Sequence, residues 1–396
     1  MKLNAHVAGV GMTPFSKFLD RGLKSIGAEA VEAALKDAGI EKSDLQAAWV
    51  GNAAAGLVTG QECIRGEVVL RSIGIGKIPV VNVENACASA STAFNQACAM
   101  VTAGFYDCVL ALGVEKLYHE DKRKTFGAFS GAVDVEALAE IMASLQNNAK
   151  SGGASEASSG AGEKRSMFMD IYAMAARSHM KAYGTTVEQF AGVSAKNSLH
   201  GSLNARAQFR EALTVEEVLA SPMIAEPLTR PMCSPIGDGA AAVVVVSEAK
   251  ARQMGLTNSV RVLSSVLRSG WDKEVGEAGV AELAAAEAYE EAGIGPADLS
   301  IIELHDASAP AEIMAYESLG ICGQGEGGSL ISDGVTKLGG RLPVNTSGGL
   351  LRKGHPVGAT GIAQIVELTE QLEGRAGDRQ VEGARFGLAH NGGGSI

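Results

Sequence analysis

The sequence predicts an α/β fold built from two similar halves. Short apolar runs with the length of buried strands alternate with helical stretches, beginning with residues 5–11, 26–38 and 47–51. This rhythm is typical of largely parallel, buried strands. An Ala-Gly-Ile triplet followed by Asp-Leu occurs within residues 38–45 and again within 292–299, at a constant offset of 254 residues (292 minus 38). In both copies we expect a helix to end at the triplet and a short turn to lead into a strand.

A second repeated pattern occurs in the same order. Each half contains a strand that starts with proline, then a loop and a long helix. Pro79–Asn82 precedes a helix expected at 89–103, and Pro343–Asn345 precedes a helix expected at 360–372. Two repeats in one order indicate a duplicated fold.

A segment of different character separates the repeats. Asn147–Ser166 is a polar Gly/Ser stretch that cannot bury a core, so we expect a mobile surface loop there. Residues 167–220 then show helical spacing, and Ala240–Val246 reads as a buried strand. The expected organisation is an N-terminal half at 1–118, completed by 222–250, an inserted loop domain at 119–221, and a C-terminal half at 256–396.

Length and composition exclude several classes of protein. The chain has 396 residues, 46% of them hydrophobic and 20% charged, which suits two domains or one large duplicated fold. Its 34 basic and 45 acidic side chains give a net charge of −11, which argues against a nucleic acid or an anionic membrane as the main partner. No apolar run approaches the roughly 18 residues of a membrane span. Without a recognisable targeting or lipidation signal, we expect a cytoplasmic protein.

The six cysteines show no spacing typical of a zinc site or a disulfide framework, so we expect neither a metal nor a disulfide. Cys98 and Cys108 read as core residues. Cys63, Cys233 and Cys322 have no assigned role.

Cys87 gives the strongest local signal for chemistry. In the segment ENACASAS it lies between a strand that ends near Val83 and a helix of small residues that extends to Gly104. Unpaired N–H groups and the positive end of the helix dipole favour a thiolate at this position, which predicts a nucleophile with a lowered pKa. The alternative is a buried structural cysteine.

Two histidines follow strand-like runs in the second half. His305 comes directly after Ile301–Leu304, and His355 lies in the turn Lys353–Pro356 before a helix. Open α/β sheets gather active groups at such strand ends. Each histidine alone is equally consistent with a structural role, but a cysteine and two histidines at comparable strand ends favour a shared site.

The C-terminal segment, from Ala389 through His390 and Asn391 to three glycines, reads as a strand end whose backbone approaches a ligand. Backbone N–H groups of Gly392 and Gly393 are candidate donors to an oxyanion, and the alternative is a flexible C-terminal end. Asp238 reads as a structural Asp-Gly turn before a buried strand. No GxGxxG or Walker pattern is present, so neither a dinucleotide site nor an NTPase is expected.

These residues resemble motifs of the thiolase superfamily, over essentially the whole chain. ENACASAS is similar to the nucleophile motif, HDAS at 305–308 to the His-Asp-Cys-Phe motif of the sterol-carrier-protein type, and NTSGGLLRKGHPVGATG at 345–361 to the Gly-His-Pro motif. GDGAAAVVVV at 237–246 resembles the strand that closes the first half.

The resemblance implies a five-layered α-β-α-β-α fold of two similar halves with an inserted loop domain over the substrate. It also implies acylation of Cys87, activation of its thiol by His355, and an oxyanion hole completed by His305. A second hole would use backbone N–H groups of Cys87 and of Gly392 or a neighbouring glycine.

The chain departs from the family at the second cysteine, which normally exchanges a proton with carbon. The two family positions for it hold His390 and Ala307 here. His390 could replace that cysteine, or His305 could act directly. A third possibility is that carbon–carbon chemistry is weak.

We therefore expect a thiolase-type acyltransferase that cleaves a 3-oxoacyl-CoA with CoA or runs the reverse Claisen condensation, with no cofactor beyond coenzyme A as substrate. The alternatives are an acyl-CoA or lipid binding protein with little thiolysis, and a catalytic subunit that needs a small zinc-bearing oligonucleotide-fold partner. A homodimer or higher oligomer is expected. Candidate substrate-binding residues are Met167, Met169, Tyr172 and Ser234.

Overall fold

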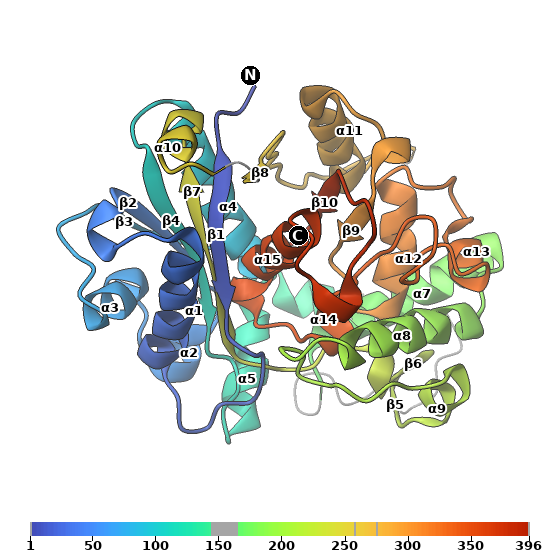
Figure 1. Ribbon diagram of the computed structural model, residues 1–396. Helices are drawn as coiled ribbons and strands as arrows, with labels where there is room; N and C mark the ends of the chain where they lie inside the picture. The colour runs from blue at the N-terminus through green and yellow to red at the C-terminus, as the bar shows by residue number, and fades with distance from the viewer. Residues whose placement is uncertain (1, 144–164, 257–258, 275, 395–396) are drawn as a thin grey trace.

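The computed structural model describes residues 2–143, 165–256, 259–274 and 276–394. Helices and sheets alternate in five layers, in the order α1 and α3, the large sheet, α4 and α15, the small sheet, and α11 with α12 (Figure 1). The predicted α-β-α-β-α layering is confirmed. The core lies on both faces of the large sheet and continues into the second half.

The large sheet has six strands. In spatial order they are β3 (Val80–Val83), β2 (Ala47–Gly51), β4 (Cys108–Glu115), β7 (Gly239–Val246), β1 (His6–Met12) and β8 (Val260–Arg261). Only β2 pairs in parallel, with β3 and β4, whereas β7 runs antiparallel to both β4 and β1. The expected largely parallel sheet is therefore wrong for this half. All eight residues of β7 are buried, and a strand covered on both faces shows an unbroken apolar run in either direction.

Helices cover both faces of this sheet. α1 (Leu23–Ala38) lies on β1, β4 and β7, beside α3 (Arg65–Ser72). On the other face, α4 (Ser89–Thr102) packs on β2 and β4, and α15 (Thr360–Leu372) packs on β7 and β1. The short helices α2 (Ala55–Thr59) and α10 (Glu248–Gln253) complete the N-terminal half. Because α15 belongs to the second half of the chain, the two halves share this central layer.

The second half repeats the first on a smaller scale. Its sheet pairs β9 (Ile301–Glu303) in parallel with β10 (Gly387–Ala389), and Val344 forms a parallel bridge to Ile302 on the other side of β9. The order Val344, β9, β10 therefore matches β3, β2, β4. The helices are α11 (Val280–Ala292), α12 (Ala309–Ser318), α13 (Gly327–Ser332), α14 (Gly349–Arg352) and α15.

The repeat at the offset of 254 has the same local structure twice. α1 and α11 both end before a glycine in the left-handed conformation, with φ of 66° at Gly39 and 69° at Gly293. A 3₁₀ turn follows at Lys42–Asp44 and at Pro296–Asp298. Each turn leads into the central strand of its parallel trio, β2 or β9. Glycine is favoured at both caps because positive φ is strained for other residues.

Between β4 and β7 the chain leaves the large sheet. The described elements there are α5 (Lys122–Ser130), α7 (Met167–Tyr183), α8 (Val187–Ser202), α9 (Val215–Ala220), β5 (Met223–Ala225) and β6 (Leu228–Thr229). The predicted Gly/Ser loop at 147–166 falls outside the described residues up to 164. Ser166 is described, and its side chain caps α7.

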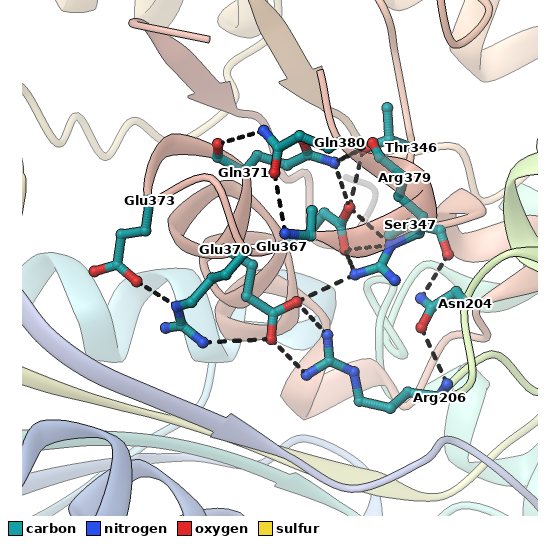
Figure 2. Close-up of polar contacts among 12 residues, drawn as sticks. Asn204, Arg206, Thr346, Ser347, Glu367, Glu370, Gln371, Glu373, Arg379 and Gln380 are labelled. Atoms are coloured by element: carbon teal, nitrogen blue, oxygen red, sulfur yellow. Dashed lines mark hydrogen bonds and ion pairs between the residues drawn. The ribbon is translucent and has the colours of Figure 1, made fainter. Parts of the chain in front are cut away.

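A buried ion-pair network fixes the C-terminal end of α15 (Figure 2). The Arg379 guanidinium donates to Glu367 at 3.0 Å and to Glu370 at 3.2 Å. Arg206, from the segment after α8, also pairs with Glu370. Nearby, the Asn204 side chain donates to the Ser347 carbonyl at 2.8 Å. These contacts join the central layer to the segment that precedes β7.

None of the described helices has the length and hydropathy needed to cross a membrane.

Candidate active site

Three predicted site residues meet where the two halves touch. Cys87 lies in the 3₁₀ turn Ala86–Ala88 that follows β3, His305 follows β9, and His355 precedes the 3₁₀ turn Val357–Ala359. The Cys87 Sγ and one ring nitrogen of each histidine all lie within 4.8 Å of one another. The two imidazole rings are 5.2 Å apart between centroids and nearly perpendicular, at 87°.

The turn that carries Cys87 is tightly constrained. Ala86 has a φ of 43°, which is unfavourable for a residue with a Cβ. The Ser89 hydroxyl accepts a hydrogen bond from the Asn85 N–H at 2.8 Å and donates to the Ala86 carbonyl at 2.7 Å. These bonds hold the strained turn and place the thiol just before the first residue of α4.

Burial, and then the Glu115 carboxylate, raise the pKa of the Cys87 thiol to about 12. Backbone N–H groups of Gly394 and of Cys87 itself hydrogen-bond the sulfur and act in the opposite direction. The expected lowering of this pKa by the helix terminus is therefore wrong. Desolvation of the charged form outweighs the two donors. The resting site holds a neutral thiol.

Glu115, at the end of β4, is buried beside this turn. Its carboxylate accepts hydrogen bonds from the N–H groups of Ala53 at 3.2 Å, Ala54 at 3.1 Å and Gly358 at 2.9 Å. Burial raises its pKa and these donors lower it. Because every contact is a donor, the contacts suit the ionised form. Glu115 thus ties the start of α2 to the turn after His355.

His355 is oriented by its own loop. Its Nδ1 lies 2.7 Å from the Thr360 hydroxyl, which donates to the Pro356 carbonyl at 3.0 Å. Nε2 is the ring nitrogen left for chemistry. Burial, and then the neighbouring His305, hold the His355 pKa well below its usual range. A neutral imidazole beside a neutral thiol can accept the thiol proton.

His305 is held by Asn391, a residue that the sequence analysis assigned no role. The Asn391 side-chain oxygen contacts His305 Nδ1, and its NH₂ donates to the Cys87 carbonyl at 3.0 Å and to the Ser91 hydroxyl at 3.1 Å. Burial, and then His390, lower the His305 pKa to about 4. One amide therefore connects the histidine to the cysteine turn.

His390 lies at the end of β10, outside the close group of three. Its N–H donates to the Glu303 carbonyl at 2.9 Å, and its carbonyl accepts from the Gln364 side chain at 3.0 Å. The ring Nδ1 is buried without a hydrogen-bond partner, and burial lowers the His390 pKa to about 4. Its position suits an influence on His305 better than direct contact with the thiol.

The glycines of the C-terminal segment differ in how tightly they pack. A Cβ at Gly393 would lie 2.5 Å from the Asn85 carbonyl oxygen and 2.8 Å from the Ala88 nitrogen, whereas a Cβ at Gly392 would meet nothing within 4 Å. Gly394 supplies the N–H that reaches the sulfur. Gly393 therefore packs closely against the Cys87 turn, and the N–H donor at the thiol comes from Gly394, the last glycine of the run, while close approach of this backbone to a ligand stays a prediction.

The site opens into a cavity of about 2210 Å³. Cys87 and the three histidines line it, together with Met169, Tyr172, Ser234 and Ala307. Met167 is buried and does not line it, so that prediction is wrong. Residues two apart on a helix point in nearly opposite directions, whereas Phe168, Met169 and Tyr172 share the face of α7 toward the cavity.

Two cysteines and one aspartate discussed in the sequence analysis have structural roles. Cys98 and Cys108 are buried in the core, as predicted. Asp238 accepts hydrogen bonds from the N–H groups of Leu117 and Tyr118, both at 2.7 Å, and pairs with the buried Lys116. Its role is structural, as expected, although it forms an antiparallel β-bridge with Ser16 and does not lie in a turn.

Family models and related sequences both match this chain to the thiolases. Residues 5–249 match the model described as "Thiolase, N-terminal domain", and residues 273–396 match "Thiolase C-terminal domain-like". Acetyl-CoA acetyltransferase of Methanothermobacter thermautotrophicus is 40% identical, over 98% of this chain and 96% of that protein. Sterol carrier protein 2 of Bos taurus is 35% identical, over 97% of this chain and 69% of that protein. Benzoylsuccinyl-CoA thiolase subunit BbsB of Thauera aromatica is 35% identical, over 100% of this chain and 96% of that protein.

Solved structures with a similar fold lead to the same family. The structure described as "Ltp2-ChsH2(DUF35) aldolase" matches with a TM-score of 0.78 and 28% identity, over 98% of this chain and 95% of that chain. Human mitochondrial 3-ketoacyl-CoA thiolase in complex with CoA matches in fold, with a TM-score of 0.67 at 17% identity, over 99% and 96%. With two family models that cover most of the chain and relatives that align along nearly all of it, the chain belongs to the thiolase family of acyltransferases.

Proposed function

We propose that the chain transfers acyl groups through a thioester on Cys87, cleaving a 3-oxoacyl-CoA with CoA or running the reverse Claisen condensation. The observation that carries this proposal is the convergence of a thiol and two imidazoles within 4.8 Å at the wall of a cavity of about 2210 Å³. Coenzyme A is the substrate, and no other cofactor is needed. The free cysteines support a cytoplasmic location.

Acylation begins with transfer of the thiol proton. As Cys87 Sγ attacks the carbonyl carbon, its proton passes to His355, and the electron pair of the carbonyl moves to oxygen. We propose that the N–H groups of Cys87 and Gly394, which act on the sulfur, donate to that oxygen. In thiolysis the C2–C3 bond then breaks, which leaves the acyl group on sulfur and an enolate on the departing acetyl-CoA.

The enolate must gain a proton, and we propose that His305 relays to it the proton that His355 took from Cys87, which leaves both imidazoles neutral. His305 lies within the group around the sulfur, whereas His390 does not. His390 keeps the His305 pKa low, so His305 returns to its neutral form readily after proton exchange. In the condensation direction the same nitrogen removes the α-proton of acetyl-CoA, and the enolate attacks the acyl-Cys87 carbonyl.

Peptide mass spectrometry after incubation with acetyl-CoA and with longer and aromatic acyl-CoAs tests the nucleophile. An adduct on Cys87 that is absent from Cys87→Ala is expected, and the acyl groups that react identify the substrate class. If CoA esters bind but no adduct forms across the panel, the chain is an acyl-CoA or lipid binding protein instead.

Exchange of the acetyl-CoA α-protons with deuterated water tests the acid/base. His305→Asn should still form some adduct on Cys87 but lose the exchange by roughly 10²-fold or more, the usual contribution of a general acid/base. His390→Asn should retain most of the α-proton exchange. The opposite order would assign the proton transfer to His390.

A second candidate is a catalytic subunit that works with a small zinc-bearing partner of the oligonucleotide-fold class. The solved structure with the TM-score of 0.78 is described by two protein names joined as one aldolase, and the relative from Thauera aromatica is described as a subunit. Turnover by the isolated chain would exclude a required partner. Turnover only after addition of such a protein would establish the requirement.

A further inference from the structure

Cys87, His305 and His355 are also a ligand set of the kind that binds zinc. We propose that the free enzyme binds one Zn²⁺, or a similarly thiophilic divalent cation such as Cd²⁺ or Co²⁺, between these three side chains, and that the bound ion blocks the nucleophile. Among the residues that the structure describes, no other group of three histidine, cysteine or acidic side chains converges in this way. The inference goes beyond acyl transfer and does not depend on it.

The spacing of the donor atoms is close to that of a zinc site. The three atoms lie within 4.8 Å of one another. Tetrahedral zinc with Zn–S of about 2.3 Å and Zn–N of about 2.0–2.1 Å needs donors roughly 3.3–3.6 Å apart. Side-chain rotations that shorten the longest separation by about 1 Å are therefore sufficient.

Both imidazoles are oriented as metal ligands usually are. The Thr360 hydroxyl contacts His355 Nδ1, and the Asn391 amide contacts His305 Nδ1. A hydrogen bond at one ring nitrogen fixes the ring and leaves the other as the donor to a metal. In both histidines the remaining atom is Nε2, so the orienting contacts are present before any ion binds.

Charge and access also favour a cation. Cys87 is beside the buried Glu115, which acts on the thiol electrostatically. That field opposes a lone thiolate but attracts a thiolate-bound Zn²⁺, whose net charge is positive. The cavity reaches all three ligands, and a fourth position on zinc remains for water, as in open zinc sites.

Binding is a ligand exchange without oxidation or reduction. The Cys87 S–H bond breaks, its proton leaves to the buffer, and the sulfur electron pair forms the Zn–S bond. Each imidazole donates a nitrogen lone pair and displaces water from the ion. With its electron pair bound to zinc, the sulfur no longer attacks a thioester or an alkylating agent.

The rate of Cys87 alkylation by iodoacetamide, followed by peptide mass spectrometry in zinc buffers, tests the site without turnover. When free Zn²⁺ is ten times its dissociation constant, about one site in eleven stays empty, so the rate should fall roughly tenfold and recover with EDTA. Co²⁺ absorption should show one thiolate-bound ion per chain. An unchanged rate in the unmodified enzyme at about 0.1 mM free Zn²⁺ overturns the proposal.

Histidine variants separate this site from binding to the thiol alone. His305→Asn and His355→Asn each keep Cys87 but should lose most of the protection, in samples whose thermal unfolding shows a folded chain. Cys63→Ser removes an exposed cysteine that does not line the cavity and should retain full protection. Equal protection in both histidine variants would contradict the three-ligand site but not the acyl transfer, which the Cys87 adduct of the unmodified enzyme tests separately.

Discussion

Cys87 gains its reactivity from a neighbour and not from its own ionisation. Burial costs the thiolate more than the two backbone donors return, so the thiol stays protonated until His355 takes the proton. Asn391 then matters because it links His305 to the same turn. The sequence indicated the cysteine and the histidines by their places at strand ends. It could not indicate Asn391, because its role depends on a contact between residues separated by 304 positions.

The pH dependence of Cys87 alkylation follows from its raised pKa. Only the thiolate reacts, and far below a pKa of about 12 its fraction rises tenfold per pH unit. The alkylation rate should therefore climb about tenfold per unit from about pH 7 to 10 without a plateau. A plateau below about pH 8 would show a stabilised thiolate instead.

Asn391→Ala should lower kcat while the chain remains folded. The substitution leaves the buried His305 Nδ1 and the Cys87 carbonyl without their amide partner, and a lost buried hydrogen bond costs about 1–3 kcal/mol. That range corresponds to roughly 5- to 150-fold in rate. Steady-state kinetics would measure it. An unchanged kcat would mean that His305 is oriented by other contacts.

Gly393→Ala and Gly392→Ala form a matched pair. The added methyl at Gly393 would collide with the Asn85 carbonyl and the Ala88 nitrogen, whereas at Gly392 it enters open space. We expect Gly393→Ala to reduce the rate of Cys87 acylation by about 10² or more, as misplacement of about 1 Å does, and Gly392→Ala to react normally. Stopped-flow acylation would compare them, and equal rates would exclude close packing of this loop as a requirement.

At the scale of elements, α15 is fixed at both ends. The His355 turn lies before its N-terminus, and the Arg379 network holds its C-terminus (Figure 2). The sequence placed this helix at 360–372 and β2 at 47–51, the bounds that the structure shows, because helical period and strand burial are local patterns. The direction of β7 was not predictable, since its partners β4 and β1 are far away in the chain.

Glu367→Ala tests the anchoring of α15. Its removal leaves the Arg379 guanidinium, only 9% exposed in its side chain, without its main counter-charge. Breaking such a buried pair costs about 3–5 kcal/mol of the free energy of unfolding. Glu373→Ala removes the partly exposed Arg375 pair on the same turn and should cost less than about 1 kcal/mol. Denaturant unfolding would measure the free energy of unfolding of both variants. Equal losses would show that burial of the Glu367–Arg379 pair does not make it more stabilising than the exposed pair.

At the scale of the whole molecule, the large sheet has an open edge. Among the described strands, β3 pairs only with β2, and Val81 on it is 38% exposed. An unpaired edge strand with an exposed apolar side chain favours pairing with another chain. We propose that two copies pair along β3, which would account for the expected homodimer.

Val81→Lys should shift the mass in solution toward the monomer, because a charge on an edge strand opposes pairing. Light scattering at matched concentrations would measure it. Leu199→Lys, on the exposed face of α8, is the control and should leave the mass unchanged. A monomeric mass for the unmodified chain would rule out the dimer itself.

The meeting of two distant turns has a consequence for biosynthesis. The Cys87 segment is translated first, and Asn391, which contacts it, follows 304 residues later. Until the C-terminal half has folded against the Cys87 turn, the sulfur lacks the burial that raises its pKa in the finished fold, and its pKa is nearer the ordinary value of about 8.5. The nascent chain is then more prone to oxidation than the mature enzyme. Once the fold is complete, the thiol stays protonated and unreactive until a substrate binds and His355 takes its proton.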